Sequence, residues 1–291
     1  MSDPNQEQLT IRKFDLSKLL TDAIIVIIGK RRSGKSFLTR EILYYYYRKR
    51  LPYGKIFSHT EFCNPFYRRH FPPLFIDDTL SDDKLQAILD SQHKKIKRRA
   101  KMYNLENGKA LENNMFLLFD DMMSDDDIWK KSKSFKKIFI EGRHASLCCV
   151  LVLQYVLGIP PALRSNVDYA FLFAADGAND LRKLYDNYAT VIPTFHMFKE
   201  IFYQCTRNFG CLVIDRTTTS EDIRDKVYYY RADSKGPPAF KFGSKAFWKA
   251  NDEGYQSSDD EDDETQRRKR LRRTIETFGA NGKKYAISFG D

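Results

Sequence analysis

One short segment constrains the fold of this chain more than any other. The apolar run AIIVII ends at Ile28 and is followed at once by GKRRSGKS and a helical stretch. The pattern GxxxxGK[ST] is satisfied by Gly29, Gly34, Lys35 and Ser36. Glycine suits such a loop because side chains would keep an anion away from successive backbone N–H groups. The segment therefore predicts a phosphate-binding loop.

The polar groups of this loop have predicted roles at a nucleoside triphosphate. Lys35 would bridge the β- and γ-phosphates, and the Ser36 hydroxyl would ligate Mg²⁺. The predicted nucleotide-contacting residues are Gly29, Arg32, Ser33, Gly34, Lys35 and Ser36. The basic insert at 30–32 either adds phosphate contacts or points outward. ATP and Mg²⁺ are therefore the expected cofactors.

Short apolar runs alternate with helical stretches along the chain, which is typical of a parallel sheet covered by helices on both faces. AIIVII and CCVLVL are apolar at every position, so both faces of the sheet are expected to be buried. Strands are predicted at 23–28, 55–58, 74–76, 115–119, 148–153, 169–173, 211–214 and 227–231. Helices are predicted at 34–49, 82–103, 128–142, 178–188 and 194–204. The expected fold class is α/β with a mostly parallel sheet.

A second signal is MFLLFDD, a predicted buried strand that ends in Asp120 and Asp121. A carboxylate at this place relative to a phosphate-binding loop can hold Mg²⁺ through its water shell, which is the predicted role of Asp120. Asp121 is the candidate to orient and polarise the water that attacks the γ-phosphate. The alternative interpretation is an acidic turn that merely ends the strand.

Three more polar residues adjoin the strand predicted at 148–153. Gln154 follows this fully apolar run, so it is either a sensor of the γ-phosphate or an exposed strand end. Arg143 and Arg164 bracket the strand, and neither has a sequence neighbour that obviously pairs with it. Each is either a surface residue or an arginine that stabilises transition-state charge at a neighbouring subunit's γ-phosphate.

The chain is basic, with 49 Lys and Arg against 39 Asp and Glu and a formal net charge of +10. Such a balance favours a polyanionic partner. The acidic run DDEDDE at 259–264 is followed by the basic block RRKRLRR, which begins at Arg267 and ends at Arg273. This tail is either a solvated linker or an acidic mask over a basic patch that binds DNA or directs nuclear entry.

A length of 291 residues fits one large α/β domain with a tail. The predicted organisation is an N-terminal extension at 1–20, a P-loop ATPase domain at 21–250 and a charged, largely disordered tail at 251–291. The longest apolar runs fall far short of the ~20 residues that cross a bilayer, so no membrane span is expected. The cysteines lack CxxC spacing, which favours reduced thiols in an intracellular setting.

Together, GKRRSGKS, LLFDD, GRHASLCCVLVLQ and LRSNVDYAFLF resemble the FtsK-HerA superfamily of DNA-pumping ATPases. CLVIDRTTTSEDIRDKVYYYRAD followed by FKFGSKAFW is similar to the poxvirus-type genome-packaging ATPases of nucleocytoplasmic large DNA viruses and their relatives. The resemblance covers residues 24–248. It implies a P-loop NTPase fold of the ASCE type, a ring of subunits around double-stranded DNA, and ATP hydrolysis that drives the genome into a preformed capsid.

The resemblance also implies residue roles. It makes Lys35 and Ser36 the Walker A pair, Asp120 the Walker B aspartate and Gln154 the sensor, with Arg143 or Arg164 as the arginine acting in trans. Many relatives place Glu where this chain has Asp121, so the shorter side chain must approach the water more closely or yield the role. The implied partners are double-stranded DNA of any sequence, further copies of the chain and a capsid or portal component. The implied location is the host cytoplasm, the virus factory or the virion.

Two other function classes remain open. A P-loop nucleotide or nucleoside kinase would need a lid over a small-substrate pocket, and no arginine-rich lid segment follows the predicted Walker B strand. A non-catalytic nucleotide- or DNA-binding scaffold would be free to lose Asp120 and Asp121. The expected function is therefore an ATP-hydrolysing DNA translocase that packages a viral genome.

Overall fold

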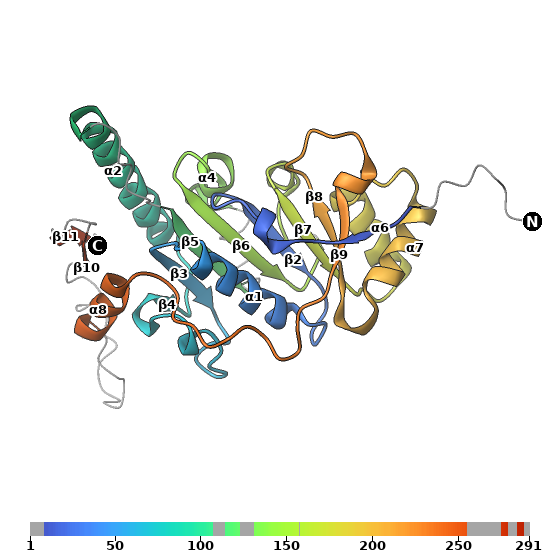
Figure 1. The fold of residues 1–291 in the computed structure, drawn as a ribbon, viewed down its shortest axis with the longest axis horizontal. Coiled ribbons are helices and arrows are strands. Elements are labelled where there is room, and N and C mark those ends of the chain that lie inside the picture. The colour runs from blue at the N-terminus through green and yellow to red at the C-terminus, as the bar shows by residue number, and fades with distance from the viewer. Residues whose placement is uncertain are drawn as a thin grey trace, which may run out of the picture. The chain divides into compact units, whose positions relative to one another are not determined.

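The computed structural model describes residues 9–106, 114–122, 131–156 and 158–254, and two strands at 275–278 and 284–287 (Figure 1). The chain divides into two compact units. Unit 1 comprises Met1–Leu19, Ile24–Ile42 and Val152–Pro237. Unit 2 comprises Leu20–Ala23, Leu43–Leu151 and Pro238–Asp291. Helix α1 (Lys35–Arg48) begins in unit 1 and ends in unit 2.

Unit 1 contains a mixed sheet whose strand order is β1-β9-β8-β7-β2. Its strands are β1 (Arg12–Lys13), β2 (Ile24–Ile28), β7 (Tyr169–Phe173), β8 (Cys211–Asp215) and β9 (Val227–Tyr230). β2 pairs with β7 in parallel, whereas β8 is antiparallel to both β7 and β9. Every residue of β2, β7 and β8 is buried, and all of them except Asp215 at the end of β8 are hydrophobic.

Short helices follow the strands of unit 1, namely α5 (Pro161–Arg164), α6 (Ala178–Tyr188) and α7 (Phe195–Cys205). α6 buries Leu181, Leu184 and Tyr188, which recur at helical spacing. α7 begins after Thr194, whose side chain accepts a hydrogen bond from the backbone N of Met197.

Unit 2 contains the strand order β6-β5-β3-β4, and β3 is parallel to both β4 and β5. The strands are β3 (Tyr53–Ser58), β4 (Ile76–Asp77), β5 (Met115–Asp120) and β6 (Leu147–Leu153), the last two residues of β6 belonging to unit 1. The helices are α2 (Asp82–Glu106), α4 (Lys133–Glu141) and α8 (Lys245–Gly254). Asp82 ties α2 to α4 by accepting a hydrogen bond from the backbone N of Ser134 at 3.1 Å.

The predicted α/β fold class with a mostly parallel sheet is confirmed: β1–β9, β2–β7, β3–β4 and β3–β5 are parallel pairs, whereas β8 is antiparallel to both of its neighbours. The strand predicted at 74–76 is wrong in its first two residues, because Pro73–Phe75 form a 3-10 helix and β4 is only Ile76–Asp77. Proline suits a helix start, since its φ is preset and it has no N–H to leave unpaired. The helix predicted at 128–142 is observed as α4, and residues 128–130 lie outside the described residues.

Both ends of the chain contain structure that the sequence analysis did not anticipate. β1 pairs with β9, and Phe14 beside it is 1% exposed, so part of the predicted extension packs onto unit 1. Residues 251–254 are helical, contrary to the disorder expected there, because the buried Asn251 side chain accepts a hydrogen bond from the backbone N of Leu74. β10 (Ile275–Phe278) and β11 (Lys284–Ile287) form an antiparallel pair.

The acidic run at 259–264 and the basic block from Arg267 to Arg273 lie outside the described residues. No helix in the part of the chain that is described has the length and apolar character to cross a membrane.

Candidate functional site

The predicted phosphate-binding loop lies in unit 1 between β2 and α1. Its backbone turns sharply because Arg32 and Gly34 both adopt left-handed conformations, with φ of 61° and 105°. A Cβ added to Gly29 would lie 2.5 Å from the Cβ of Phe173 at the end of β7. Real carbon atoms do not approach so closely, so only glycine fits at position 29. The loop therefore passes directly over the end of β7.

Two polar side chains of the loop face its own backbone. The Lys35 ammonium donates to the carbonyl oxygens of Gly29 at 2.6 Å and Lys30 at 2.8 Å. Ser33 is only 7% exposed, and its hydroxyl has no hydrogen-bond partner among the described residues. That Oγ would lie 2.9 Å from a Cβ on Gly29, so it faces the first glycine of the loop. A buried hydroxyl without a partner is costly, and an anion in the loop would supply its acceptor.

The basic insert of the loop is engaged by neighbouring side chains of unit 1. Lys30 forms a surface ion pair with Asp176 at 2.6 Å. Arg31 Nε donates to Gln154 Oε1 at 3.1 Å. β6 brings Gln154 there, because the backbone N of Gly29 donates to the Leu153 carbonyl at 3.2 Å. The structure therefore brings the predicted sensor residue to the phosphate-binding loop.

Asp120 is the last residue of β5 in unit 2. Its Oδ2 accepts a hydrogen bond from the Tyr67 hydroxyl at 2.7 Å. Tyr67 is 2% exposed, and burial raises its pKa well above the usual value, with the Asp120 charge raising it further. The phenol consequently remains protonated and donates to the carboxylate at any physiological pH.

Tyr67 is held by a buried glutamate. Both the backbone N of Tyr67 and that of Phe66 donate to Glu61 Oε2, at 2.9 Å and 2.8 Å. Tyr67 could not be predicted from the sequence, because 53 positions separate it from Asp120 and no local pattern joins them. The charge of Asp120 is thus positioned by a contact that only the tertiary structure reveals.

The backbone bends between the two adjacent aspartates. Asp120 still has strand conformation, whereas Asp121 has a left-handed φ of 55°. Aspartate tolerates this region better than most residues, because its short polar side chain can hydrogen-bond locally. Both side chains are partly buried in unit 2.

The two candidate arginines differ in their surroundings. Arg164, at the end of α5, donates from Nε to the Ile159 carbonyl at 2.8 Å and from Nη1 to the Asn187 side chain. Its guanidinium is therefore held by its own subunit. Arg143 is exposed, in the turn between α4 and β6 of unit 2.

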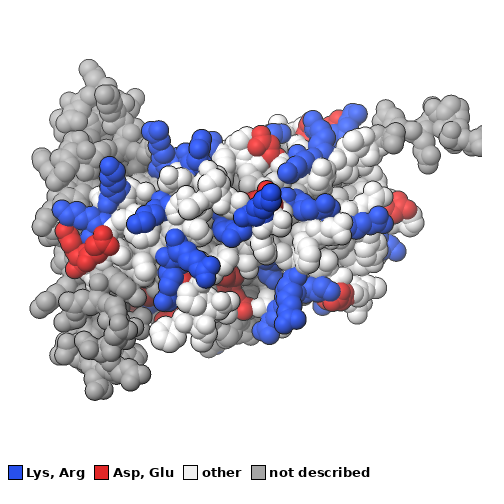
Figure 2. Space-filling model, turned by 60° about the horizontal axis from the view of Figure 1, so that its bottom comes forward, with Lys and Arg blue, Asp and Glu red and all other residues white. Residues whose placement is uncertain are grey.

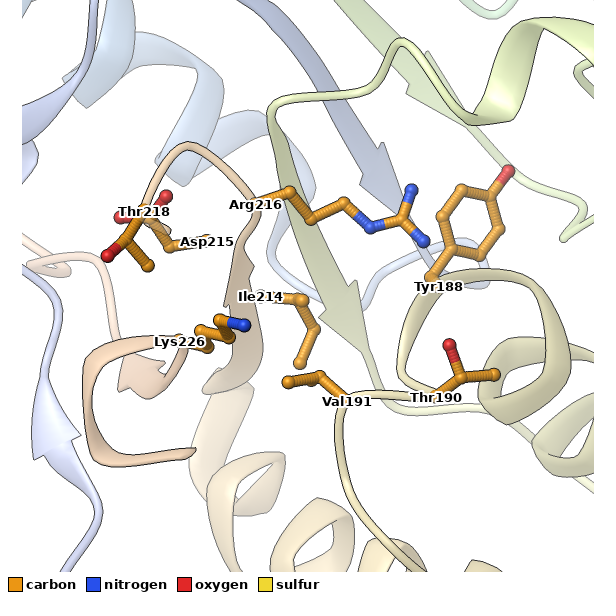
Figure 3. Close-up of a pocket in the computed structure, with 8 residues that line it drawn as sticks. All are labelled: Tyr188, Thr190, Val191, Ile214, Asp215, Arg216, Thr218 and Lys226. Atoms are coloured by element: carbon orange, nitrogen blue, oxygen red, sulfur yellow. The ribbon is translucent and has the colours of Figure 1, made fainter. Parts of the chain in front are cut away.

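Unit 1 contains a pocket whose lining includes Arg216, a neighbour of the Arg164 backbone (Figure 3). Its lining residues are Tyr188, Thr190, Val191, Ile214, Asp215, Arg216, Thr218 and Lys226. Figure 3 shows the Arg216 guanidinium directed toward the Tyr188 ring, and Arg216 also donates to the Arg164 carbonyl at 2.9 Å. Burial raises the pKa of Tyr188 to about 12. The β7–β8 register pairs Tyr169 with Asp215, so the pocket lies at the strand ends opposite the phosphate-binding loop.

Unit 1 therefore brings together the loop residues Gly29, Arg32, Ser33, Gly34, Lys35 and Ser36 with Gln154, whereas Arg164 is bound elsewhere in that unit. Asp120, Asp121 and Arg143 belong to unit 2.

The model of the poxvirus A32 protein family matches residues 11–210 of this chain. Protein L437 of Acanthamoeba polyphaga mimivirus is 35% identical over 243 residues, which cover 84% of this chain and 83% of the relative. Protein 075L of Invertebrate iridescent virus 6 is 37% identical over 220 residues, covering 75% of this chain and 81% of the relative.

Among solved structures, the chain is similar to the genome packaging NTPase B204 of Sulfolobus turreted icosahedral virus 2, solved in complex with AMP. The TM-score is 0.52 at 16% identity, covering 74% of this chain and 100% of B204. At this identity the likeness concerns the fold, and it confirms the predicted α/β P-loop NTPase architecture. The family match and the viral relatives extend over most of the chain, so the chain belongs to the poxvirus A32 protein family.

Proposed function

We propose that this chain is an ATP-hydrolysing translocase of double-stranded DNA that packages a viral genome into a capsid. The observation that carries the proposal is the loop at 29–36, where Gly29 leaves room for no side chain and the Ser33 hydroxyl is buried without a partner among the described residues. The family of this chain, and the fold that it shares with a genome packaging NTPase, support the same function.

ATP with Mg²⁺ suits the residues of the site. The loop offers backbone N–H groups and the Lys35 cation to a triphosphate. Ser36 and Asp120 offer hard oxygen ligands of the type that Mg²⁺ prefers, and we assign the metal to them. Bound Mg²⁺ would neutralise the charge that develops on the phosphates during transfer. The described residues contain no group of three or more His, Cys, Asp or Glu that could hold a metal ion.

The proposed catalytic roles fall to residues outside the loop. Asp121 orients the attacking water, and Gln154 senses the γ-phosphate beside the loop, where Arg31 holds its amide. Arg143 is the better candidate to act on a neighbouring subunit's nucleotide, because its side chain is exposed whereas that of Arg164 is partly buried.

The proposed assembly is a homo-oligomeric ring around double-stranded DNA, docked on a capsid or portal component in the host cytoplasm, the virus factory or the virion. The Lys and Arg clusters favour contacts with DNA phosphates, which carry no sequence information. DNA of any sequence would therefore be accepted.

Steady-state phosphate release, measured with and without long duplex DNA, tests this function. A translocase is stimulated by DNA, a nucleotide kinase is indifferent to it, and a scaffold releases no phosphate. Lys35→Ala should abolish turnover. Asp121→Asn should retain ATP binding and lose hydrolysis by roughly 10²-fold or more, as expected for a positioned acid-base group.

The matched control is Asp186→Asn, which changes an exposed aspartate of α6 that pairs only with Arg182 among the described contacts. It should hydrolyse ATP at the wild-type rate. For the arginines, Arg143→Ala should lose DNA-stimulated turnover. Arg164→Ala should lower the melting temperature, because it removes internal hydrogen bonds. Wild-type turnover in the Lys35 variant would eliminate the assignment of ATP hydrolysis to this loop.

A further inference from the structure

An exposed aromatic residue lies beside the phosphate-binding loop. Phe209 ends a 3-10 turn (Arg207–Phe209) between α7 and β8, and it is 69% exposed. A Cβ placed on Gly34 would lie 3.3 Å from the Phe209 Cβ and 3.4 Å from its carbonyl oxygen. The turn that carries the ring therefore touches the loop.

The sheet register explains this proximity. β2 and β7 are parallel and pair Ile28 with Leu172, so the loop leaves β2 at the carboxyl end of β7. β8 is antiparallel and pairs Cys211 with Phe173, so the turn that precedes β8 lies at that same end. All of these residues belong to unit 1. The position of Phe209 beside Gly34 is thus fixed by backbone pairing.

The backbone of the turn holds Phe209 in an uncommon conformation. Asn208 and Phe209 both lie in the left-handed region, with φ of 52° and 61°. This region is rare for a bulky residue. Contacts with neighbouring residues fix this turn. Gly210 lies so close to the Cys205 carbonyl that a Cβ at position 210 would collide with it. Arg231 donates a hydrogen bond to the Arg207 carbonyl at 3.2 Å. Strained backbone of this kind concentrates at ligand sites.

We propose that Phe209 is the wall on which the nucleobase stacks when a nucleoside triphosphate occupies the loop. The inference rests on the proposed function, because it takes the triphosphate to be anchored at 29–36. An exposed phenyl face beside a phosphate site offers a base the apolar, quadrupolar surface on which aromatic rings stack. A purine covers more of a phenyl ring than a pyrimidine does, so ATP and GTP should bind more tightly than CTP and UTP.

The test compares the affinities of the full-length chain for ATP, CTP and inorganic tripolyphosphate by isothermal titration calorimetry in the presence of Mg²⁺. The decisive variant is Phe209→Asn, because asparagine tolerates left-handed backbone and lacks the ring. It should lower ATP affinity roughly tenfold to a hundredfold, the usual effect of losing a stacked aromatic, and leave tripolyphosphate affinity unchanged. Phe209→Trp should retain ATP affinity.

Tyr203→Ala provides the matched control, because Tyr203 is an exposed aromatic of α7, 52% exposed, that is outside the proposed site. It should bind ATP and CTP as the wild type does. Unchanged ATP affinity in Phe209→Asn would overturn the proposal. An equal loss of tripolyphosphate affinity would do so too, because the ring would then merely support the loop.

If Phe209→Asn does not fold, the nucleotide affinities of the wild type still test the proposal. Equal affinity for ATP and CTP would contradict stacking of the base on Phe209. A folded wild type that binds neither ATP nor tripolyphosphate would instead refute the proposed function itself. The two failures are therefore distinguishable.

Discussion

At the scale of single residues, the Tyr67 hydroxyl is the clearest addition to the site. It is a buried donor aimed at the Asp120 carboxylate, to which we assign Mg²⁺, and hydrogen-bond partners of this kind orient metal ligands. Tyr67→Phe removes the hydroxyl and keeps the ring. We expect the Mg²⁺ concentration for half-maximal ATP turnover to rise roughly tenfold or more, as is typical for loss of such a partner.

Tyr53→Phe is the control for that experiment. Its hydroxyl is also partly buried and donates to Gln92 Oε1 at 2.8 Å, but Tyr53 pairs with Met115, at the opposite end of β5 from Asp120. The Mg²⁺ dependence of Tyr53→Phe should match the wild type. Identical Mg²⁺ titrations for Tyr67→Phe and the wild type would show that the hydroxyl has no part in positioning Asp120.

Lys95 in α2 gives a prediction about pH. Its ammonium lies 3.6 Å from the centre of the Tyr53 ring, and burial lowers the pKa of Lys95 to about 7 from 10.5. Between these two values the unfolded chain binds more protons than the folded chain. The free energy of unfolding contributed by this residue therefore rises as the pH increases from about 7 toward 10.5.

Urea unfolding of the wild type and of Lys95→Met, at about pH 6.5 and about pH 9.5, measures this pH dependence of the free energy of unfolding. The gain in stability between the two pH values should shrink in Lys95→Met. Lys97→Met changes an exposed lysine of the same helix and should keep the wild-type gain. A gain that is equal in all three proteins would contradict the shifted pKa.

At the scale of elements, α1 binds the segment that follows β9. Glu41 accepts hydrogen bonds from the Tyr230 hydroxyl and from the backbone N of Asp233, both at 2.7 Å. Further along, Gly236 adopts a φ of 67° and lies so close to Arg40 that a Cβ would collide with the guanidinium. The helix that begins in the phosphate-binding loop is thus tied to a segment near position 235.

Glu41→Ala should lower the free energy of unfolding by about 1–3 kcal/mol, because it leaves the buried Tyr230 hydroxyl without its acceptor. Chemical denaturation provides the measurement. Glu200→Ala alters an exposed glutamate of α7 and should change stability by less than about 0.5 kcal/mol. If the two variants were equally stable, the contact between α1 and the segment after β9 would not contribute to the free energy of unfolding.

At the scale of the whole molecule, the positive charge is the dominant property. Figure 2 shows one face on which Lys and Arg side chains are spread widely and Asp and Glu side chains are confined to a few places. With a formal net charge of +10, binding to duplex DNA should be governed by the release of counterions. Affinity measured at about 50 and 200 mM salt should fall by orders of magnitude, and a nearly constant affinity would rule out phosphate tracking.

The tail supplies a second test of the charge distribution. Replacing the acidic run at 259–264 with neutral residues should tighten DNA binding at low salt if that run masks the basic block from Arg267 to Arg273. Deleting the basic block in the same variant should reverse the gain. Unchanged affinity would mean that the tail is a linker only.

The sequence alone determined the local elements and the position of the loop. β2 is apolar at every residue, GxxxxGK[ST] follows it, and both signals depend on residues adjacent in the chain. The helix predicted at 178–188 is α6, because Leu181, Leu184 and Tyr188 recur at helical spacing. The strand β1 was not predicted, because an edge strand of two residues, Arg and Lys, is too short to show the hydrophobic alternation of a strand.

The tertiary structure decided which distant residues meet at the loop and at Asp120. Phe173 lies under Gly29, Phe209 lies beside Gly34, and Tyr67 donates to Asp120. Each of these contacts follows from strand register or from a buried hydrogen bond between segments far apart in the chain. Such pairings depend on how whole elements pack, and packing leaves no signature in any short stretch of sequence.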